Sequence, residues 1–186
     1  MHRTDLEHYS VFYKELGELR SYNSSDLLEV KKDIFSEYFK EDFSKLKSKD
    51  FKFSNSYHIF GETPYSISHT RGNLTALFMK HNISCGVDTE LRKRKFNFGV
   101  VERVIPSVPV EWPRNIQMWT KLESLYKAFC QEAGKLKQDL PYSLIHEDIS
   151  WLGTNELMTK YGRFRFLNGP DQPNYYTSIC VKSGIL

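Results

Sequence analysis

The sequence predicts an α+β protein, in which helices alternate with short strands joined by hairpins. Two segments carry apolar residues at intervals of three and four, the period of an amphipathic helix. Several shorter segments have the composition and flanking turn residues of strands. Helices interleaved with hairpin-connected strands are typical of the α+β class. The 186 residues, of which 40% are hydrophobic, suffice for one domain or two small lobes with a core.

The first helix is expected within residues 24–47. Apolar side chains recur there every three or four positions, and Ser24 or Ser25 is available as the N-cap. The segment forms one long amphipathic helix or two short ones. Residues 54–64 are polar and turn-forming, and a glycine and a proline mark a break in the pattern.

Three short strands are expected next, at residues 65–68, 74–80 and 83–88. We expect residues 80–82 to form the hairpin turn between the second and the third of these strands. Such a hairpin would place Ser68 and His69 at one end of the sheet and Asp88 at a neighbouring strand end.

Three prolines within residues 105–114 predict a loop or a broken turn. An apolar stripe at helical spacing follows, from Met118 to Phe129, and predicts the second helix. Glu123 and Lys127 lie off that stripe, toward the boundary with solvent. The tail is expected to add strands at residues 143–149, 161–167 and 175–182.

Two acidic patterns about thirty residues apart suggest a shared site. Asp88 and Glu90, in residues 86–90 (GVDTE), leave the same face of an extended strand. Glu123 and Lys127, in residues 119–127 (WTKLESLYK), share one helix face. Magnesium takes one or two protein carboxylates together with water and phosphate oxygens, so the patterns predict a phosphate-handling site. Taken alone, Glu123 and Lys127 would be an ordinary helix-surface pair worth roughly 0.2–0.5 kcal/mol.

The composition narrows the class of protein. A formal net charge of +3 is far from the charge density of a dedicated nucleic-acid binder. The N-terminus lacks the apolar stretch of a signal peptide, and no later run is long enough to span a bilayer. Three cysteines without a Cys-x-x-Cys unit favour a reducing compartment. We therefore expect a cytoplasmic monomer that binds neither nucleic acid nor membrane. Residues 92–95 (RKRK) are either a solvated loop or a docking site for an acidic partner.

Residues 66–70 (SISHT), together with the two acidic patterns, resemble the motifs of the 4'-phosphopantetheinyl transferases. The resemblance is to the larger type, which activates nonribosomal peptide and polyketide synthetases. It covers roughly residues 59–130, with all three motifs in the family's order. It implies two similar α+β halves side by side with the coenzyme between them, here a shortened half of residues 1–68 and a second half of residues 69–186.

The resemblance also implies an activity. The 4'-phosphopantetheine arm of coenzyme A would be transferred to a serine of an acyl or peptidyl carrier protein, with Mg²⁺ bound and 3',5'-ADP released. Asp88 and Glu123 are the implied metal ligands, and Glu90 is a third ligand or holds metal-bound water. Glu123 would also accept the serine proton, and Lys127 would hold the α-phosphate.

Ser68 and His69 correspond to the family's coenzyme-binding pair. The chain departs from the family at Leu122, where a lysine usually precedes the helix glutamate, because its own lysine is displaced to Lys121. A shift of one residue turns a helical side chain by about 100°. An impaired relative that binds coenzyme A or a carrier without efficient transfer is therefore an alternative. An unrelated interaction module, the third possibility, would leave Asp88 and Glu123 far apart. The family's early basic residues that grip the 3'-phosphate have candidates by residue type in Arg20, Lys31 and Lys32.

Overall fold

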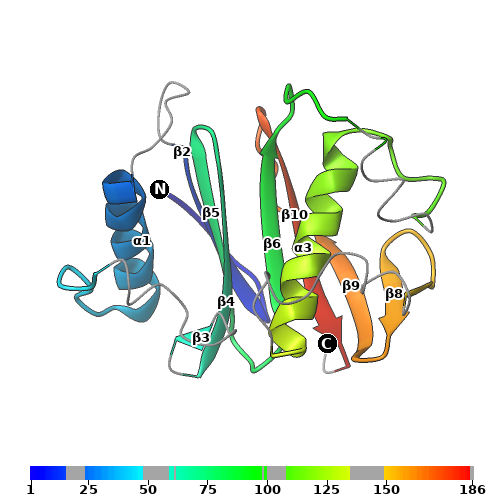
Figure 1. Ribbon diagram of the computed structural model, residues 1–186. Helices are drawn as coiled ribbons and strands as arrows, with labels where there is room; N and C mark the ends of the chain where they lie inside the picture. Colours follow the sequence, from blue (N-terminus) through cyan, green and yellow to red (C-terminus); the bar gives the residue numbers. More distant parts are fainter. Residues whose placement is uncertain are drawn as a thin grey trace.

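The computed structural model describes residues 1–15, 24–47, 59–60, 62–97, 99, 108–134 and 149–184. The described chain is a mixed α+β structure with two five-stranded antiparallel sheets. Four layers follow one another across the molecule, with a helix outside each sheet and the two sheets between the helices (Figure 1). The predicted α+β class is confirmed.

The first sheet has the strand order β1-β2-β5-β4-β3. Its strands are β1 (His2–Asp5), β2 (Tyr9–Glu15), β3 (Ile59–Phe60), β4 (Thr63–Thr70) and β5 (Asn73–Met79). Strands β4 and β5 form a hairpin whose turn is Arg71 and Gly72, and the φ of 84° at Gly72 is one that glycine adopts without a Cβ clash.

Helix α1 (Ser24–Phe39) covers the outer face of the first sheet. Alternate residues of β5 point to opposite faces, so Leu74, Ala76 and Phe78 pack toward the helix. Phe35 of α1 is fully buried there, at the centre of a cluster of aromatic rings in edge contact. The helix ends at Phe39, earlier than the predicted limit of residue 47, and Lys40 follows it with φ 58°.

The second sheet has the order β6-β10-β9-β8-β7. Its strands are β6 (Cys85–Leu91), β7 (Ser150–Trp151), β8 (Glu156–Thr159), β9 (Gly162–Asn168) and β10 (Tyr175–Ser183). Helix α3 (Ile116–Glu132) packs on its outer face. The side chain of Asn115 caps this helix by accepting a hydrogen bond from the Gln117 amide at 2.8 Å.

The inner faces of the two sheets bury a common apolar layer. Its buried members are Tyr9, Val11, Leu77, Met79, Ile83, Cys85, Val87, Ile179 and Val181. Residues from β2 and β5 of the first sheet therefore pack directly against β6 and β10 of the second. This packing brings the ends of β4 and β6, with their polar motifs, side by side.

The predicted hairpin turn at residues 80–82 is wrong. Strand β5 pairs with β2 and β4, whereas β6 pairs with β10, so residues 80–84 cross from one sheet to the other. The strands predicted at 161–167 and 175–182 are confirmed as β9 and β10. The strand predicted at 143–149 lies outside the described residues except for Ile149, which is not in a strand.

The predicted division of the chain after residue 68 stays a prediction. The first sheet extends through β5 to Met79, and the second begins with Cys85 of β6. The change from one sheet to the other therefore falls between residues 79 and 85.

Candidate functional site

Strand β6 presents its motif residues to two different layers. Gly86 and Asp88 face helix α3, whereas Val87 and Thr89 face the first sheet. A Cβ atom on Gly86 would lie 2.0 Å from the Ser124 carbonyl oxygen of α3. Glycine therefore lets the helix backbone rest directly on the strand, which brings the helix carboxylate and ammonium groups to Asp88.

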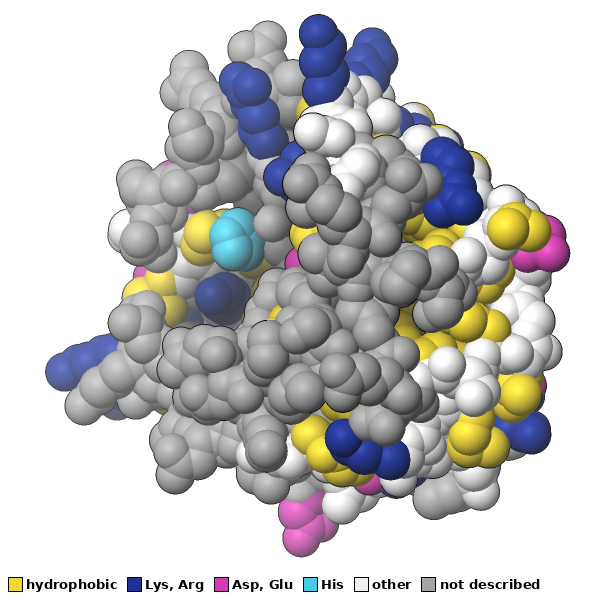
Figure 2. All heavy atoms as spheres, turned by 45° about the vertical axis from the view of Figure 1, so that its right-hand side comes forward, with side chains coloured by type: hydrophobic (Ala, Val, Ile, Leu, Met, Phe, Trp, Pro, Cys, Tyr) yellow, Lys and Arg dark blue, Asp and Glu magenta, His cyan; other side chains and the backbone are white. Residues whose placement is uncertain are grey.

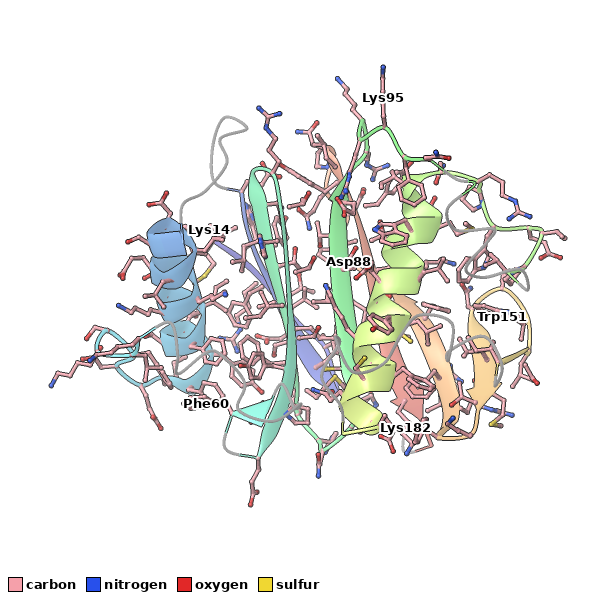
Figure 3. The ribbon with its side chains drawn as sticks, in the orientation of Figure 1. Lys14, Phe60, Asp88, Lys95, Trp151 and Lys182 are labelled. Carbon is pink, nitrogen blue, oxygen red and sulfur yellow. The ribbon has the colours of Figure 1, made fainter. Side chains whose placement is uncertain are left out.

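Asp88 is the centre of the polar cluster (Figure 3). Its Oδ1 accepts hydrogen bonds from Lys127 Nζ at 2.8 Å and from Ser68 Oγ at 2.9 Å. Lys127 Nζ also donates to the Val87 carbonyl oxygen at 2.8 Å. Oδ2 is buried and has no hydrogen-bond partner in the described part of the chain. A buried carboxylate oxygen without a donor is costly unless a cation or another donor binds it.

Glu123 is buried beside this cluster, with 7% of its surface exposed. Its predicted location at the boundary with solvent is wrong, because the residue is buried on a helix that packs against β6 and β10. Burial raises the pKa of Asp88, the Lys127 ammonium opposes that rise, and the Glu123 charge adds to it. The two acids are therefore near enough to repel each other. The structure brings Asp88, Glu123, Lys127 and Ser68 together.

A row of hydroxyl groups on β4 joins the two sheets. We call Ser66, Ser68 and Thr70 the hydroxyl ladder, since alternate residues of the strand share one face. Ser66 Oγ accepts from the Val87 amide at 3.0 Å, and Ser68 Oγ accepts from the Thr89 amide at 3.1 Å. The ladder therefore satisfies amides at the edge of β6, where no strand pairs. The alternation of residues 66–70 was the signal for it in the sequence.

We expect Ser66→Ala to lower the free energy of unfolding by about 1–3 kcal/mol, because it leaves the buried Val87 amide without an acceptor. Urea denaturation followed by circular dichroism measures the change. Ser183→Ala is the matched control, because Ser183 Oγ has no partner among the described residues. Equal stability of the two variants would contradict a role of the ladder in joining the sheets.

Buried polar side chains continue this joint beyond Asp88. Thr89 Oγ1 lies 2.9 Å from Thr75 Oγ1 of the first sheet and 3.1 Å from Thr177 Oγ1 of β10. Asn73 accepts from Thr75 at 2.9 Å and donates to Gln172 Oε1 at 2.5 Å. The network fixes how β6 sits against β5, and thereby the place of the carboxylates that flank Thr89.

Glu90 has partners at both carboxylate oxygens. Thr70 Oγ1 donates to Oε2 at 3.1 Å, and the Arg94 guanidinium pairs with Oε1. Glu90 is buried on the same strand as Asp88. Its role as a third ligand or as a holder of metal-bound water stays a prediction.

His69 lies at the same end of β4 with its side chain exposed. Partial desolvation by the surrounding protein and the positive charges of Lys31 and Lys127 lower its pKa, against the opposing effect of Asp88. Lys31, half-buried on α1, is therefore close to His69, and burial lowers its own pKa. Lys32 instead pairs with Glu29 at 2.8 Å. The positive charges of Lys31 on α1 and Lys127 on α3 therefore both act on His69. Figure 2 shows one face of the molecule, with Lys and Arg side chains at several places on it.

Two further basic residues singled out from the sequence are Arg20 and the displaced Lys121. Arg20 lies outside the described residues. Lys121 points away from Asp88, with its Nζ 3.1 Å from Asn155 Oδ1 and 4.5 Å from the centre of the Trp112 ring. Leu122 is buried in the core under α3. Lys121 therefore does not replace the lysine that the resembling family places before the helix glutamate.

The basic segment 92–95 divides into two kinds of residue. Arg92 is held by the Gln172 and Tyr175 carbonyl oxygens and by the Tyr176 ring, whose centre is 4.4 Å away. Lys93 and Lys95 are exposed, and Lys95 projects from the molecule (Figure 3). The exposed pair is available to an acidic partner.

Asp88 and Glu123 suit a divalent cation as a pair. Within the described ranges, no three His, Cys, Asp or Glu side chains are grouped closely enough to hold a metal ion by themselves. Magnesium needs only one or two carboxylates when substrate phosphate supplies further oxygens. The unpartnered Oδ2 of Asp88 and the adjacent Glu123 charge fit that requirement.

A small cavity of about 40 Å³ lies beside α3. The described residues that line it are Gln117, Thr120, Lys121, Leu167, Asn168, Tyr176, Thr177 and Ser178. They do not include Asp88, Glu123 or His69, although Ser178 is the cross-strand partner of Asp88. The cavity therefore neighbours the carboxylate site without containing it.

Comparison with protein families finds no family that the chain matches, and comparison with curated proteins finds no relative. The described helices include none with the length and apolar character that crossing a membrane requires. Inference about activity therefore rests on the motifs and on the geometry of the site.

Proposed function

We propose that the protein transfers the 4'-phosphopantetheine arm of coenzyme A to a serine of an acyl or peptidyl carrier protein. One observation carries the proposal: three motifs that are remote in sequence supply Ser68, Asp88, Glu123 and Lys127 to a single cluster. An unrelated module with chance motifs would have no reason to bring two buried carboxylates and an ammonium together. Their proximity argues against that alternative.

Each residue of the cluster has a separate role in the proposed transfer reaction. The carrier serine oxygen bonds to the β-phosphorus of coenzyme A while the bond to the bridging oxygen breaks, and 3',5'-ADP leaves. Glu123 accepts the serine proton, and Lys127 offsets the negative charge that gathers on the departing α-phosphate. Mg²⁺ bound by Asp88 and Glu123 would neutralise phosphate charge. Glu90, tied to Thr70 and Arg94, holds the neighbouring end of β6 in place.

The coenzyme's phosphates would lie toward His69 and Lys31. Desolvation and then the charges of Lys31 and Lys127 lower the pKa of His69, and a bound anion would offset the positive charge. Ser68 would contact the coenzyme from the buried side of β4, next to Asp88. Lys31, on helix α1, is the early basic residue that we assign to the 3'-phosphate, because its charge acts on His69.

The wider architecture supports the same proposal. Each sheet carries one helix on its outer face, which suits two related α+β halves side by side. The site lies where the two sheets meet, as a coenzyme between two halves requires. The exposed Lys93 and Lys95 would attract an acidic carrier and speed its encounter.

Incubation with coenzyme A, Mg²⁺ and a panel of apo carrier proteins tests the proposal. We expect one or more carriers to gain the mass of one phosphopantetheine group, measured by intact-protein mass spectrometry. The gain should disappear when the carrier's acceptor serine is replaced by alanine. Absence of any mass gain across the panel would contradict transfer.

One observation favours a second candidate, a relative that binds coenzyme A or a carrier without efficient transfer. Leu122 is buried and Lys121 is engaged by Asn155, so the lysine that the resembling family places before the helix glutamate has no counterpart at that place. Calorimetry with coenzyme A alone distinguishes this candidate from an unrelated module, and the carrier mass gain distinguishes it from the enzyme. Binding without transfer supports the impaired relative, and binding with transfer supports the enzyme.

A further inference from the structure

We propose that Lys127 is an internal counter-ion of Asp88, which makes divalent-cation binding at Asp88 and Glu123 depend on the arrival of the coenzyme's pyrophosphate. The inference rests on the proposed function and deepens it, since it assigns an order of binding to the same site. It concerns cation affinity, which is measurable without any transfer reaction.

The contacts of Asp88 carry the inference. Lys127 Nζ lies 2.8 Å from Asp88 Oδ1, and the two side chains are only 16% and 7% exposed. Ser68 donates to the same oxygen, so Oδ1 already has two donors. The ammonium also has a second anchor in the Val87 carbonyl oxygen, which holds it over the carboxylate. Oδ2 is buried without a partner in the described chain.

A divalent cation at this place would meet the ammonium at close range. Like charges separated by a few ångströms in a partly buried site repel strongly, because the surrounding medium screens them less than water does. The cation must therefore displace Lys127 from Asp88 or bind weakly beside it. Displacement without a new partner would leave a half-buried ammonium unpaired, which is costly.

The coenzyme's pyrophosphate removes this conflict. Its negative charge gives the Lys127 ammonium a new partner and supplies oxygens to the cation. Lys127 can then leave Asp88, whose carboxylate becomes available as a metal ligand. By linkage, coenzyme A tightens cation binding by the same factor by which the cation tightens coenzyme binding. The cluster would thus bind metal and coenzyme together rather than singly.

A Mn²⁺ titration, followed by the paramagnetic resonance signal of the free ion, tests the inference. Without coenzyme, we expect Lys127→Gln to bind Mn²⁺ about tenfold more tightly than the unaltered protein, because a repelling charge has been removed. Lys121→Gln is the matched control. It removes an ammonium group from the same helix, but that group contacts Asn155 and not Asp88, so Mn²⁺ affinity should be unchanged. Equal or weaker Mn²⁺ binding by Lys127→Gln would overturn the inference.

The unaltered protein provides a second measurement, which does not depend on how well a variant folds. Coenzyme A should tighten Mn²⁺ binding at least about tenfold, after correction for the ion that coenzyme A binds in buffer. Equal affinity with and without coenzyme overturns the inference, even if transfer is observed. Conversely, if Lys127→Gln binds Mn²⁺ more tightly but the unaltered protein modifies no carrier, the counter-ion is supported and the transferase is contradicted.

Discussion

Replacing Glu123 by glutamine is expected to lower the rate of phosphopantetheine transfer by about 10²–10⁴-fold, the range contributed by a general base. Glutamine has nearly the shape of glutamate but neither accepts the serine proton nor offers a full negative charge to a cation. Single-turnover transfer, followed by carrier mass, measures the rate. The circular dichroism spectrum should be unchanged, because the buried side chain keeps its volume.

A second readout separates this role from a structural one. The Glu123 charge helps to raise the pKa of Asp88, so Glu123→Gln should lower that pKa, as followed by carbon NMR of the Asp88 carboxyl. Glu132→Gln, on the same helix but paired with Ser84 and Lys182, is the control and should retain transfer. Undiminished transfer by Glu123→Gln would remove Glu123 as the base.

Gly86→Ala is expected to have the largest effect on stability, a loss of at least about 3 kcal/mol in the free energy of unfolding. The added methyl group would lie 2.0 Å from the Ser124 carbonyl oxygen and 2.7 Å from the Ala128 amide nitrogen, both backbone atoms that cannot turn aside. Helix α3 would have to move off β6. Chemical denaturation measures the loss, and the displaced helix should also weaken transfer.

Gly99→Ala provides the comparison for this prediction. Its added methyl group would meet Asn97 Oδ1 at 3.5 Å, an ordinary contact, so the change in stability should stay within about 0.5 kcal/mol. A Gly86→Ala variant as stable as Gly99→Ala would show that α3 does not rest on β6 through this glycine.

The contact of Asp88 with Ser68 and Lys127 could be predicted from the motifs, although the strand pairing expected to produce it was wrong. A predicted hairpin at residues 80–82 would have paired two strands of one sheet, whereas the structure brings β4 and β6 together across two sheets. Alternation along a strand fixes which residues share a face. It does not fix which strand lies opposite, because pairing depends on packing between distant segments.

Other features of the structure depend on contacts between distant segments and could not be predicted from the local sequence. The strands β1 and β2 were not predicted from the first fifteen residues, because their pattern is completed only by pairing with each other and with β5. Helical periodicity identifies only the apolar stripe of a helix, so it places Glu123 at the boundary between that stripe and solvent. Its burial depends on how α3 packs on β6 and β10, which the helix's own sequence does not show. Likewise, the approach of Lys31 to His69 depends on how α1 packs on the first sheet.

In the proposed reaction, Asp88 and Glu123 together bind one magnesium-pyrophosphate unit of coenzyme A. A crystal structure of the protein with coenzyme A and Mg²⁺ tests it most directly. We expect one Mg²⁺ in contact with both carboxylates and with the pyrophosphate, Lys127 on the α-phosphate, and His69 beside the coenzyme. Coenzyme bound elsewhere, or a magnesium ion that touches neither Asp88 nor Glu123, would contradict it.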